Sequence, residues 1–533
     1  MNHANPVLVK KLALTLLLLL GLIACGPVTP PPTVPPTSTP LPTHTPAPTP
    51  VSTTTPAWVY DNPPISLVHN GLLLPTATTI SVTDTPYPTD ECMEGCVRWF
   101  VGLGPGLNPE QLDVEGFVIH DFYNEFLYGK SWDDRIYLWM EVVPYTWAKD
   151  AIVTEIAADN GPDLIGPIGW QGASILHGQL LDLKPHLAKI PEITKDFNPE
   201  LLDAYSTTEG QISLPFALYP SAIFYNMALF DKAGLAYPPA SYGPDLGPAT
   251  YRLDGRDVAW DWDTVREVAR RLTLDANGRH TGEARFDKGS IVQYGFTWNF
   301  ENQPSYIGTF WGNGAYADGT TAQLPAAWKD AWAWTYDGTW GDAPFIPGSS
   351  ASANLDNGNP FNSGQVAMTG QPSWYTCCMG NLKTWDIGVL PAYRGKVAGR
   401  VDADFFVIWK GTRLPDKAFK ALTYLNTTGV QKLIIGSKDS PPAYNAIPAR
   451  ADDQAAWLEV KKAQFPWVRH WDVLLTNLAF PDSPSAEAYM PNYEKAWDRG
   501  GRFYQLLAGI GGLNLEHEEA NFLTDLQEIF DEK

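Results

Sequence analysis

The chain has 533 residues, and its 37 lysines and arginines against 59 aspartates and glutamates give a formal net charge of −22. An acidic chain without a basic block is a poor match for nucleic acid or anionic lipid, so we exclude both as its main partner. Residues 91–533 are more than a single hydrophobic core usually serves. We therefore expect a folded body of two lobes.

The first residues have the order of a secretory signal. Two lysines at 10–11 precede an uncharged apolar run at 12–23, which is too short to span a bilayer because crossing takes about 20 apolar residues. The run ends in Leu22-Ile23-Ala24-Cys25, which resembles the lipobox of bacterial lipoproteins. The resemblance implies that residues 1–24 are removed and that acylated Cys25 anchors the chain to the membrane. An ordinary signal with an incidental cysteine is the alternative.

A tether is expected over residues 25–90. Positions 27–56 contain twelve prolines and ten threonines, a composition that cannot bury a core and favours an extended spacer. Residues 57–90 mix a small apolar patch with Pro and Thr, and we assign them no element.

Four further cysteines fall in two close sets, Cys92 with Cys96 and the adjacent Cys377 and Cys378. An even number fits an oxidising exterior. Three pairings are possible and two local disulfides are favoured, with free buried thiols as the alternative. Neither set has the spacing or the histidine neighbours of a metal site, so we expect no metal and no other cofactor.

Strands and helices alternate along the chain after residue 96. Short apolar runs at 97–103, 135–143 and 163–168 have the character of buried strands, and helical spacing of apolar residues covers 109–126 and 149–158. This β-α-β-α-β order predicts an α/β fold with a parallel sheet, helices on both faces and ligand-binding loops at the strand ends.

No catalytic motif is present. The loop Gly102-x-Gly104-x-Gly106 is a poor phosphate cradle, because its third glycine is misplaced and Pro105 removes an amide donor. The chain contains no Walker lysine, nucleophile elbow or zinc-protease helix. We therefore predict no catalytic residue.

Three blocks of sequence, in order over residues 95–450, resemble the family 1 extracellular solute-binding proteins. Residues 154–187 (TEIAADNGPDLIGPIGWQGASILHGQLLDLKPHL) are similar to a helix, a strand and the following loop of that family. Residues 210–239 (GQISLPFALYPSAIFYNMALFDKAGLAYPP) have its G-x-x-x-x-P-F…Y-N…L-F…A-G-L…P-P pattern. Residues 364–425 contain GQVAMTGQPSW, then WDIGVLPAYRGK, then PDKAFKALTYL.

This resemblance implies a type II periplasmic-binding-protein-like fold. It consists of two α/β lobes, three crossings between them and a ligand cleft that closes by hinge motion. Lobe 1 is expected over 91–219 and 388–440, and lobe 2 over 220–387 and 441–533, with the third crossing near 436–446.

Ligand-binding candidates are taken from positions that match the family motifs or lie in loops. The first is Trp374, which ends an A-M-x-x-x-x-x-W motif where sugar-binding members have a stacking aromatic. An aromatic ring packs against the CH face of a sugar while polar groups bind its hydroxyls. A core tryptophan is the alternative. The further candidates, some chosen only for their loop position, are Trp170, Gln171, Tyr219, Trp298, Trp311 and Gly104.

Asp402 and Asp404 precede an apolar strand at a place where family members often have glycine. A carboxylate there could accept hydrogen bonds from ligand hydroxyls or pair with a cationic ligand. A salt bridge to Arg400 is the alternative.

The 21 tryptophans of the chain favour a carbohydrate ligand. The predicted function is that of a monomeric extracytoplasmic lipoprotein that captures a small solute, a sugar or oligosaccharide, and delivers it to the permease of an ABC transporter. A sensory receptor module with the same ligand and an extracytoplasmic glycosidase are the two alternatives.

Overall fold

The computed structural model describes residues 65–66, 96–103, 109–131, 134–299, 302–437, 441–482, 485–487 and 490–532. The expected signal, Cys25, the tether except for residues 65–66, Cys92 and Gly104 lie outside the described residues.

A mixed sheet of nine strands forms the centre of the described fold. Its order is β1 (Ile65–Ser66), β3 (Tyr137–Val142), β2 (Cys96–Val101), β4 (Leu164–Ile168), β18 (Val401–Ile408), β7 (Pro215–Asn226) and β14 (Met368–Pro372), with β15 (Trp385–Gly388) and β19 (Ile447–Pro448) also paired to β7. Strand β2 is parallel to β3 and β4, whereas β18 is antiparallel to β4 and β7. The expected α/β alternation over 97–168 is confirmed.

Strand β7 joins the two parts of this sheet. It is buried along its whole length, as its continuous apolar sequence predicts. Residues 215–220 pair with β18, and residues 221–225 pair with β14. We call β1–β4, β18 and β19 with residues 215–220 the first half-sheet, and β14 and β15 with residues 221–226 the second half-sheet.

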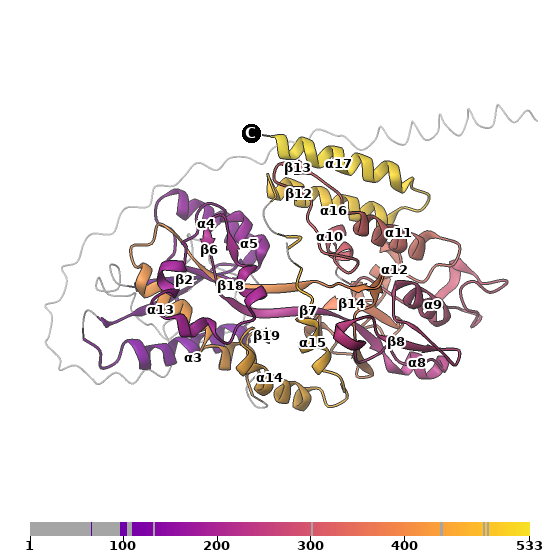
Figure 1. Cartoon of the computed structure of the whole chain (residues 1–533), viewed down its shortest axis with the longest axis horizontal. Helices are drawn as coiled ribbons and strands as arrows, with labels where there is room; N and C mark the ends of the chain where they lie inside the picture. The colour runs from indigo at the N-terminus through magenta and orange to yellow at the C-terminus, as the bar shows by residue number, and fades with distance from the viewer. Residues whose placement is uncertain are drawn as a thin grey trace, which may run out of the picture. The chain divides into compact units, whose positions relative to one another are not determined.

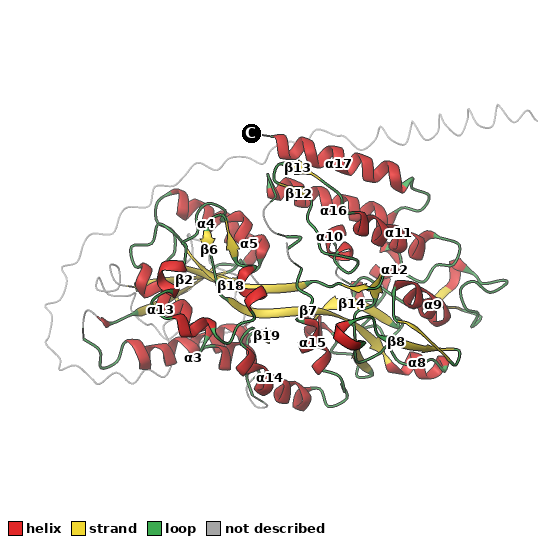
Figure 2. Cartoon of the chain, viewed as in Figure 1, coloured by secondary structure: helices red, strands yellow, loops and turns green. Residues whose placement is uncertain are grey.

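Figure 1 shows β7 and β18 crossing the centre, with α3, α4 and α5 at one end and α9, α11 and α12 at the other. Helices lie above and below the strands (Figure 2). The helices are α3 (Pro109–Phe126), α4 (Tyr145–Ala157), α5 (Trp170–Ile175), α6 (Lys184–Leu187), α7 (Pro199–Asp203), α8 (Met227–Ala233), α9 (Trp262–Leu272), α10 (Pro304–Gly308), α11 (Ala326–Trp340), α12 (Ser349–Asn354), α13 (Pro415–Asn426), α14 (Ala451–Gln464), α15 (Asp472–Asn477), α16 (Tyr493–Gly509) and α17 (Leu515–Asp531).

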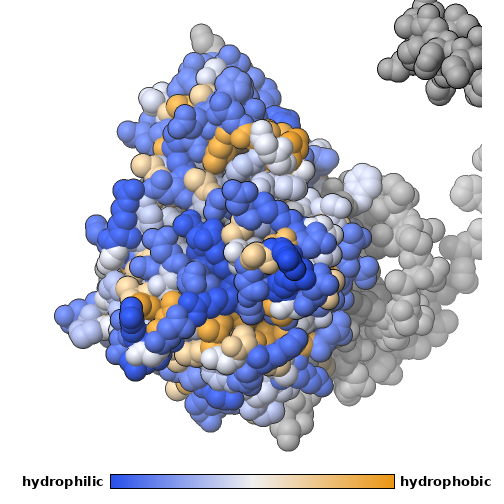
Figure 3. Space-filling view, turned by 90° about the vertical axis from the view of Figure 1, so that its right-hand side faces the viewer, coloured by the Kyte–Doolittle hydropathy of each residue, from blue (hydrophilic) through white to orange (hydrophobic). Residues whose placement is uncertain are grey.

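Short two-stranded antiparallel sheets lie outside the nine-stranded sheet. They are β5 (Ser206–Thr207) with β6 (Gly210–Gln211), β8 (Thr250–Leu253) with β9 (Arg256–Ala259), β10 (Leu274–Asp275) with β11 (Ile291–Gln293), β12 (Ala317–Asp318) with β13 (Thr321–Ala322), and β16 (Ala392–Tyr393) with β17 (Lys396–Val397). None of the helices in the described part of the chain has the length and hydrophobicity needed to cross a membrane. On the face shown in Figure 3, hydrophilic residues predominate and hydrophobic ones form smaller patches.

The segment after β18 stays with the first half-sheet further along the chain than expected. Ile447 and Pro448 pair with residues 217–218 of β7, and Arg450 at the start of α14 binds Asp196 at 2.7 Å. Directly after α14, the ring of Phe465 packs against Trp385 of β15 with 5.9 Å between centroids, and Nδ1 of His470 lies 2.9 Å from Asp386 of the same strand. We therefore propose that the third crossing falls between residues 464 and 470 rather than near 436–446.

Helix α9 shows how local sequence sets an element boundary. The carboxylate of Asp261 accepts a hydrogen bond from the Thr264 amide at 2.8 Å and caps the helix. The apolar residues Val265, Val268 and Leu272 recur at helical spacing and are buried. The helix therefore has one capped end and one core-facing side.

Replacing the cap tests this assignment. Asp261→Ala leaves the Thr264 amide without its acceptor, so we expect the free energy of unfolding to fall by about 1 kcal/mol. Urea denaturation followed by circular dichroism measures it. Asp263→Ala is the control, because that side chain is 86% exposed and we expect a change below about 0.5 kcal/mol. Equal effects of the two substitutions would contradict the assignment.

Candidate ligand-binding site

Trp374 lies in η6 (Ser373–Cys378), a short 3-10 turn that directly follows β14. Its indole N–H donates to Oδ2 of Asp402 in β18, at 2.7 Å. Two residues predicted from the sequence are therefore in direct contact, one in the turn after β14 of the second half-sheet and one in β18 of the first. The indole is only partly buried, so part of its surface is open to solvent.

Asp402 is also bound by Arg400, with Nη2 and Oδ2 2.6 Å apart. The ion pair that we considered as an alternative to ligand contact is therefore present. The guanidinium of Arg400 lies over the ring of Tyr306, 3.4 Å from its centroid, and Arg400 is only 3% exposed. Stacking and ion pairing together stabilise a buried arginine at this point.

Further carboxylates surround this arginine. The hydroxyl of Tyr306 in α10 is hydrogen-bonded to Glu487, and the backbone amide of Val401 donates to Asp482 at 3.0 Å. Burial raises the pKa of Asp482 to about 8, and the charge of Asp402 adds to this effect. Burial likewise raises the pKa of Glu487 above its ordinary value.

Asp404 lies two residues further along β18 and is 8% exposed. The Tyr219 hydroxyl donates to its Oδ2 at 3.1 Å. Burial raises the pKa of Asp404 to about 7 despite that hydrogen bond. The structure thus places the candidates Tyr219 and Asp404 in contact, at the point where β7 and β18 pair.

Trp170 and Gln171 begin α5, next to the end of β4. The Trp170 ring stacks on Tyr205 with 5.5 Å between centroids and an interplanar angle of 18°. Trp170 is 6% exposed and Gln171 is partly buried. The hydroxyl of Ser174 in the same helix donates to the carbonyl of Glu487 at 3.3 Å, so α5 adjoins the segment that carries this carboxylate.

Trp298 and Trp311 lie in a buried aromatic cluster of the second half. Trp311 stacks on Trp262 at 3.9 Å and 13°, and the Trp298 indole donates to Thr335 at 3.0 Å. Trp298 is 6% exposed and Trp311 is 4% exposed. Trp298 also lines a cavity of about 200 Å³ between α11, α12 and α16.

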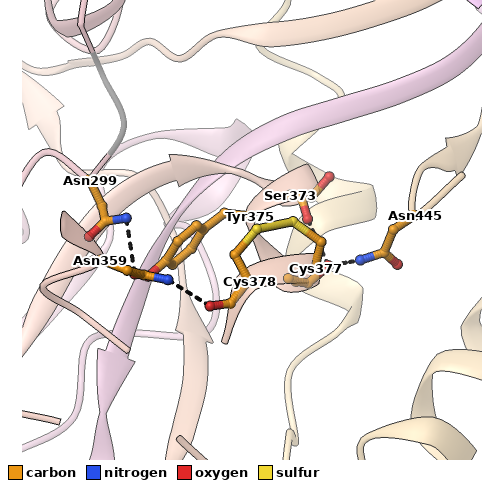
Figure 4. Close-up of a disulfide and its surroundings, with 8 residues drawn as sticks. Asn299, Asn359, Ser373, Tyr375, Cys377, Cys378 and Asn445 are labelled. Carbon is orange, nitrogen blue, oxygen red and sulfur yellow. Dashed lines mark hydrogen bonds between the residues drawn. A yellow bond between two sulfur atoms is a disulfide. The ribbon is translucent and has the colours of Figure 1, made fainter. Parts of the chain in front are cut away.

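Cys377 and Cys378, at the end of η6, form a disulfide between adjacent residues. Figure 4 shows it next to Ser373 and Tyr375 of the same turn. Cys377 is exposed and Cys378 is partly buried. Cys96 is disulfide-bonded as well. Among the side chains that the structure describes, no group of three or more His, Cys, Asp or Glu is placed to hold a metal ion.

Sequence reasoning did not identify three residues at this site, Tyr306, Asp482 and Glu487. Tyr306 contacts Arg400 through its ring, and Asp482 accepts from the Val401 amide 81 positions away. Glu487 joins the site through Tyr306, from which it is separated by 181 positions. From the sequence, Arg400 is predicted only as a salt-bridge partner for Asp402 and Asp404. No local pattern marks such contacts.

A family model described as "Bacterial extracellular solute-binding protein" matches residues 138–461 of the chain. This match covers more than half of the chain, and the chain therefore belongs to that family. It is a solute-binding protein with the two-lobed fold of its structural neighbours. A search among curated proteins found no similar sequence.

Several solved structures have a similar fold. One is the ABC substrate-binding protein Lmo0181 from Listeria monocytogenes in complex with cycloalternan, with a TM-score of 0.59 and 16% identity over 82% of this chain and 100% of that one. The GacH receptor of Streptomyces glaucescens, solved unliganded and with acarbose, has a TM-score of 0.55 and 16% identity over 82% and 99%. The domain MalE from Bdellovibrio bacteriovorus bound to maltotriose has a TM-score of 0.53 and 18% identity over 81% and 98%.

The raised pKa values of Asp404 and Asp482 predict a pH-dependent stability. Between about pH 4 and pH 8 the folded chain retains protons at these sites that the unfolded chain has released. The free energy of unfolding should therefore fall as the pH rises from 5 to 8. Urea denaturation at pH 5, 6, 7 and 8 measures this.

The matched control is the double variant Asp404→Asn with Asp482→Asn, which should have a shallower pH dependence. The slope should not vanish, because burial also raises the pKa of Glu115 to about 8. A stability that rises from pH 5 to pH 8, or an unchanged slope in the variant, would contradict the assignment.

Proposed function

We propose that this chain is the solute-binding lipoprotein of an ABC importer, and that it captures an oligosaccharide between its two lobes and releases it unchanged to a membrane permease. The observation that carries this proposal is the contact between Trp374 and Asp402. It brings an aromatic ring and a carboxylate from opposite half-sheets to one point. Membership of the family and the sugars named for three neighbours of the same fold support it.

The chemistry of the site suits a sugar. The partly exposed Trp374 ring offers an apolar surface for a CH face, and its hydrogen bond to Asp402 fixes the plane of the ring. Asp402, whose side chain is 19% exposed, offers an acceptor for hydroxyl groups, and its ion pair with Arg400 holds it in place. We propose Trp170, Gln171, Tyr219, Asp404 and Gly104 as further contacts, and Trp298 and Trp311 as supports of the second lobe.

We propose that the chain acts as a monomer at the extracytoplasmic face of the cell membrane. Acylated Cys25 would hold it there, and the Pro- and Thr-rich residues 27–56 would act as the spacer. At about 3.1 Å per residue, an extended spacer of this length reaches roughly 90 Å from the lipid. A body with this reach could bind solute and still meet a permease in the same membrane.

Substitution of Trp374 tests the site. Titration of the full-length chain in mild detergent with maltotriose and cycloalternan, followed by calorimetry, should show saturable binding to at least one of them. Burying an aromatic side chain is worth about 1.5–3 kcal/mol, so Trp374→Ala should weaken that binding by roughly tenfold to a hundredfold. Chromatography of the mixture should recover the sugar intact.

Trp147→Ala is the matched control, because this tryptophan of α4 is 64% exposed and should not affect affinity. Absence of binding to any sugar, or equal affinity of the Trp374 variant and the unmodified chain, would refute the proposed site. A cleaved sugar would refute the binding-only function.

A further inference from the structure

The η6 turn is hydrogen-bonded to both half-sheets. On one side, Trp374 donates to Asp402 at 2.7 Å, and the Thr376 hydroxyl accepts a hydrogen bond from the side-chain amide of Asn445. Asp402 pairs with Tyr219 across β18 and β7, and Asn445 lies just before β19. Asp402 belongs to the first half-sheet and Asn445 lies two residues before its strand β19, whereas η6 itself continues from β14 of the second.

Other described hydrogen bonds of η6 are made with residues on the β14 side. The hydroxyl of Tyr375 donates to Oδ1 of Asn359 at 2.6 Å, and Nδ2 of Asn359 donates to the carbonyl of Cys378 at 2.7 Å. Asn299 supports Asn359 with a hydrogen bond of 3.1 Å. Figure 4 shows Asn299 and Asn359 on one side of the disulfide and Asn445 on the other. Trp374 and Thr376 thus bind residues in or next to the first half-sheet, while Tyr375 and Cys378 bind Asn359, which precedes β14 of the second.

A buried lysine orients the Asn445 contact. Lys461 of α14 is 2% exposed, and its ammonium donates to Oδ1 of Asn445. This bond turns the Nδ2 group of Asn445 toward Thr376, whose hydroxyl in turn donates to the carbonyl of Ser373 at 2.9 Å. Each donor in this series of hydrogen bonds, from Lys461 through Asn445 to Thr376, therefore has a defined acceptor.

The Cys377–Cys378 disulfide closes the end of this turn. A bond between adjacent residues forms a small ring that contains the intervening peptide group, so it restricts the backbone torsions of both residues. Without the disulfide, these backbone torsions would lose conformational freedom each time η6 forms its hydrogen bonds to the first half-sheet, and this loss of entropy would oppose the contact. Cys377 is exposed, so a soluble reductant can reach the bond.

We propose that η6 is a latch between the two lobes and that Cys377 and Cys378 are its positioning residues, so that opening their disulfide weakens the latch and lowers ligand affinity reversibly. The statement about ligand rests on the proposed function. A dithiol reductant would open the S–S bond and supply two electrons and two protons. It leaves thiols on Cys377 and Cys378 and becomes the oxidised, cyclic disulfide.

The test compares the full-length chain with the variant Cys377→Ser/Cys378→Ser. Without sugar, hydrogen exchange measured by mass spectrometry should be faster in the variant for peptides that contain residues 373–378 and 441–446. With maltotriose and acarbose as probes, affinity should fall roughly thirtyfold or more, as expected from ordering the backbones of two more residues on closure. Treating the unmodified chain with dithiothreitol should reproduce both changes, and reoxidation should reverse them.

The double variant also controls for Cys96, because dithiothreitol should have no further effect on these readouts in a chain that lacks the vicinal pair. Lys461→Met tests the latch from its other end without touching a cysteine, and it should speed exchange at 441–446. Unchanged exchange in both variants would overturn the latch even if the probes bind. Faster exchange in a chain that binds neither probe would support the latch and count against the proposed function.

Discussion

The architecture depends on one shared strand. β7 is a buried run of 12 residues whose first half hydrogen-bonds to β18 and whose second half bonds to β14 and β15. Because both half-sheets use the same strand, groups at the ends of their other strands meet close to its centre. The contacts of Tyr219 with Asp404 and of Trp374 with Asp402 are consequences of this placement. A binding residue from either lobe therefore needs no long loop to reach the site.

A second constraint is electrostatic. Arg400 is the buried cation of this region, and the carboxyl groups of Asp402, Asp482 and Glu487 lie close enough to perturb one another. Among the described contacts, Asp402 forms a direct ion pair with Arg400. Burial therefore raises the pKa values of Asp482 and Glu487, and protonation lowers the cost of enclosing them. A polar, hydrogen-bonding site remains without a large uncompensated charge, which suits a neutral polyhydroxylated ligand.

Much of the fold could be predicted from sequence because its signals are local. The apolar runs at 97–103 and 163–168 and the helix over 109–126 appear close to the expected bounds, since side-chain period and turn residues act over a few positions. Trp374 is predicted from a family motif and Asp402 from a departure from the family pattern, and they come together because β14, which η6 follows, and β18 both pair with β7. The third crossing that we propose and the contact of Glu487 could not be predicted from local signals. Nothing in the sequence at 436–470 marks where the chain changes lobe, and Glu487 meets Tyr306 only through folding of segments 181 positions apart.

A crystal structure of the chain with maltotriose would test the central claim most directly, which is that a sugar binds where the two half-sheets meet at Trp374 and Asp402. The account predicts a pyranose ring against the Trp374 indole, with a hydroxyl group bonded to Asp402. A sugar located instead in the cavity beside Trp298, with no contact to Trp374, would contradict it.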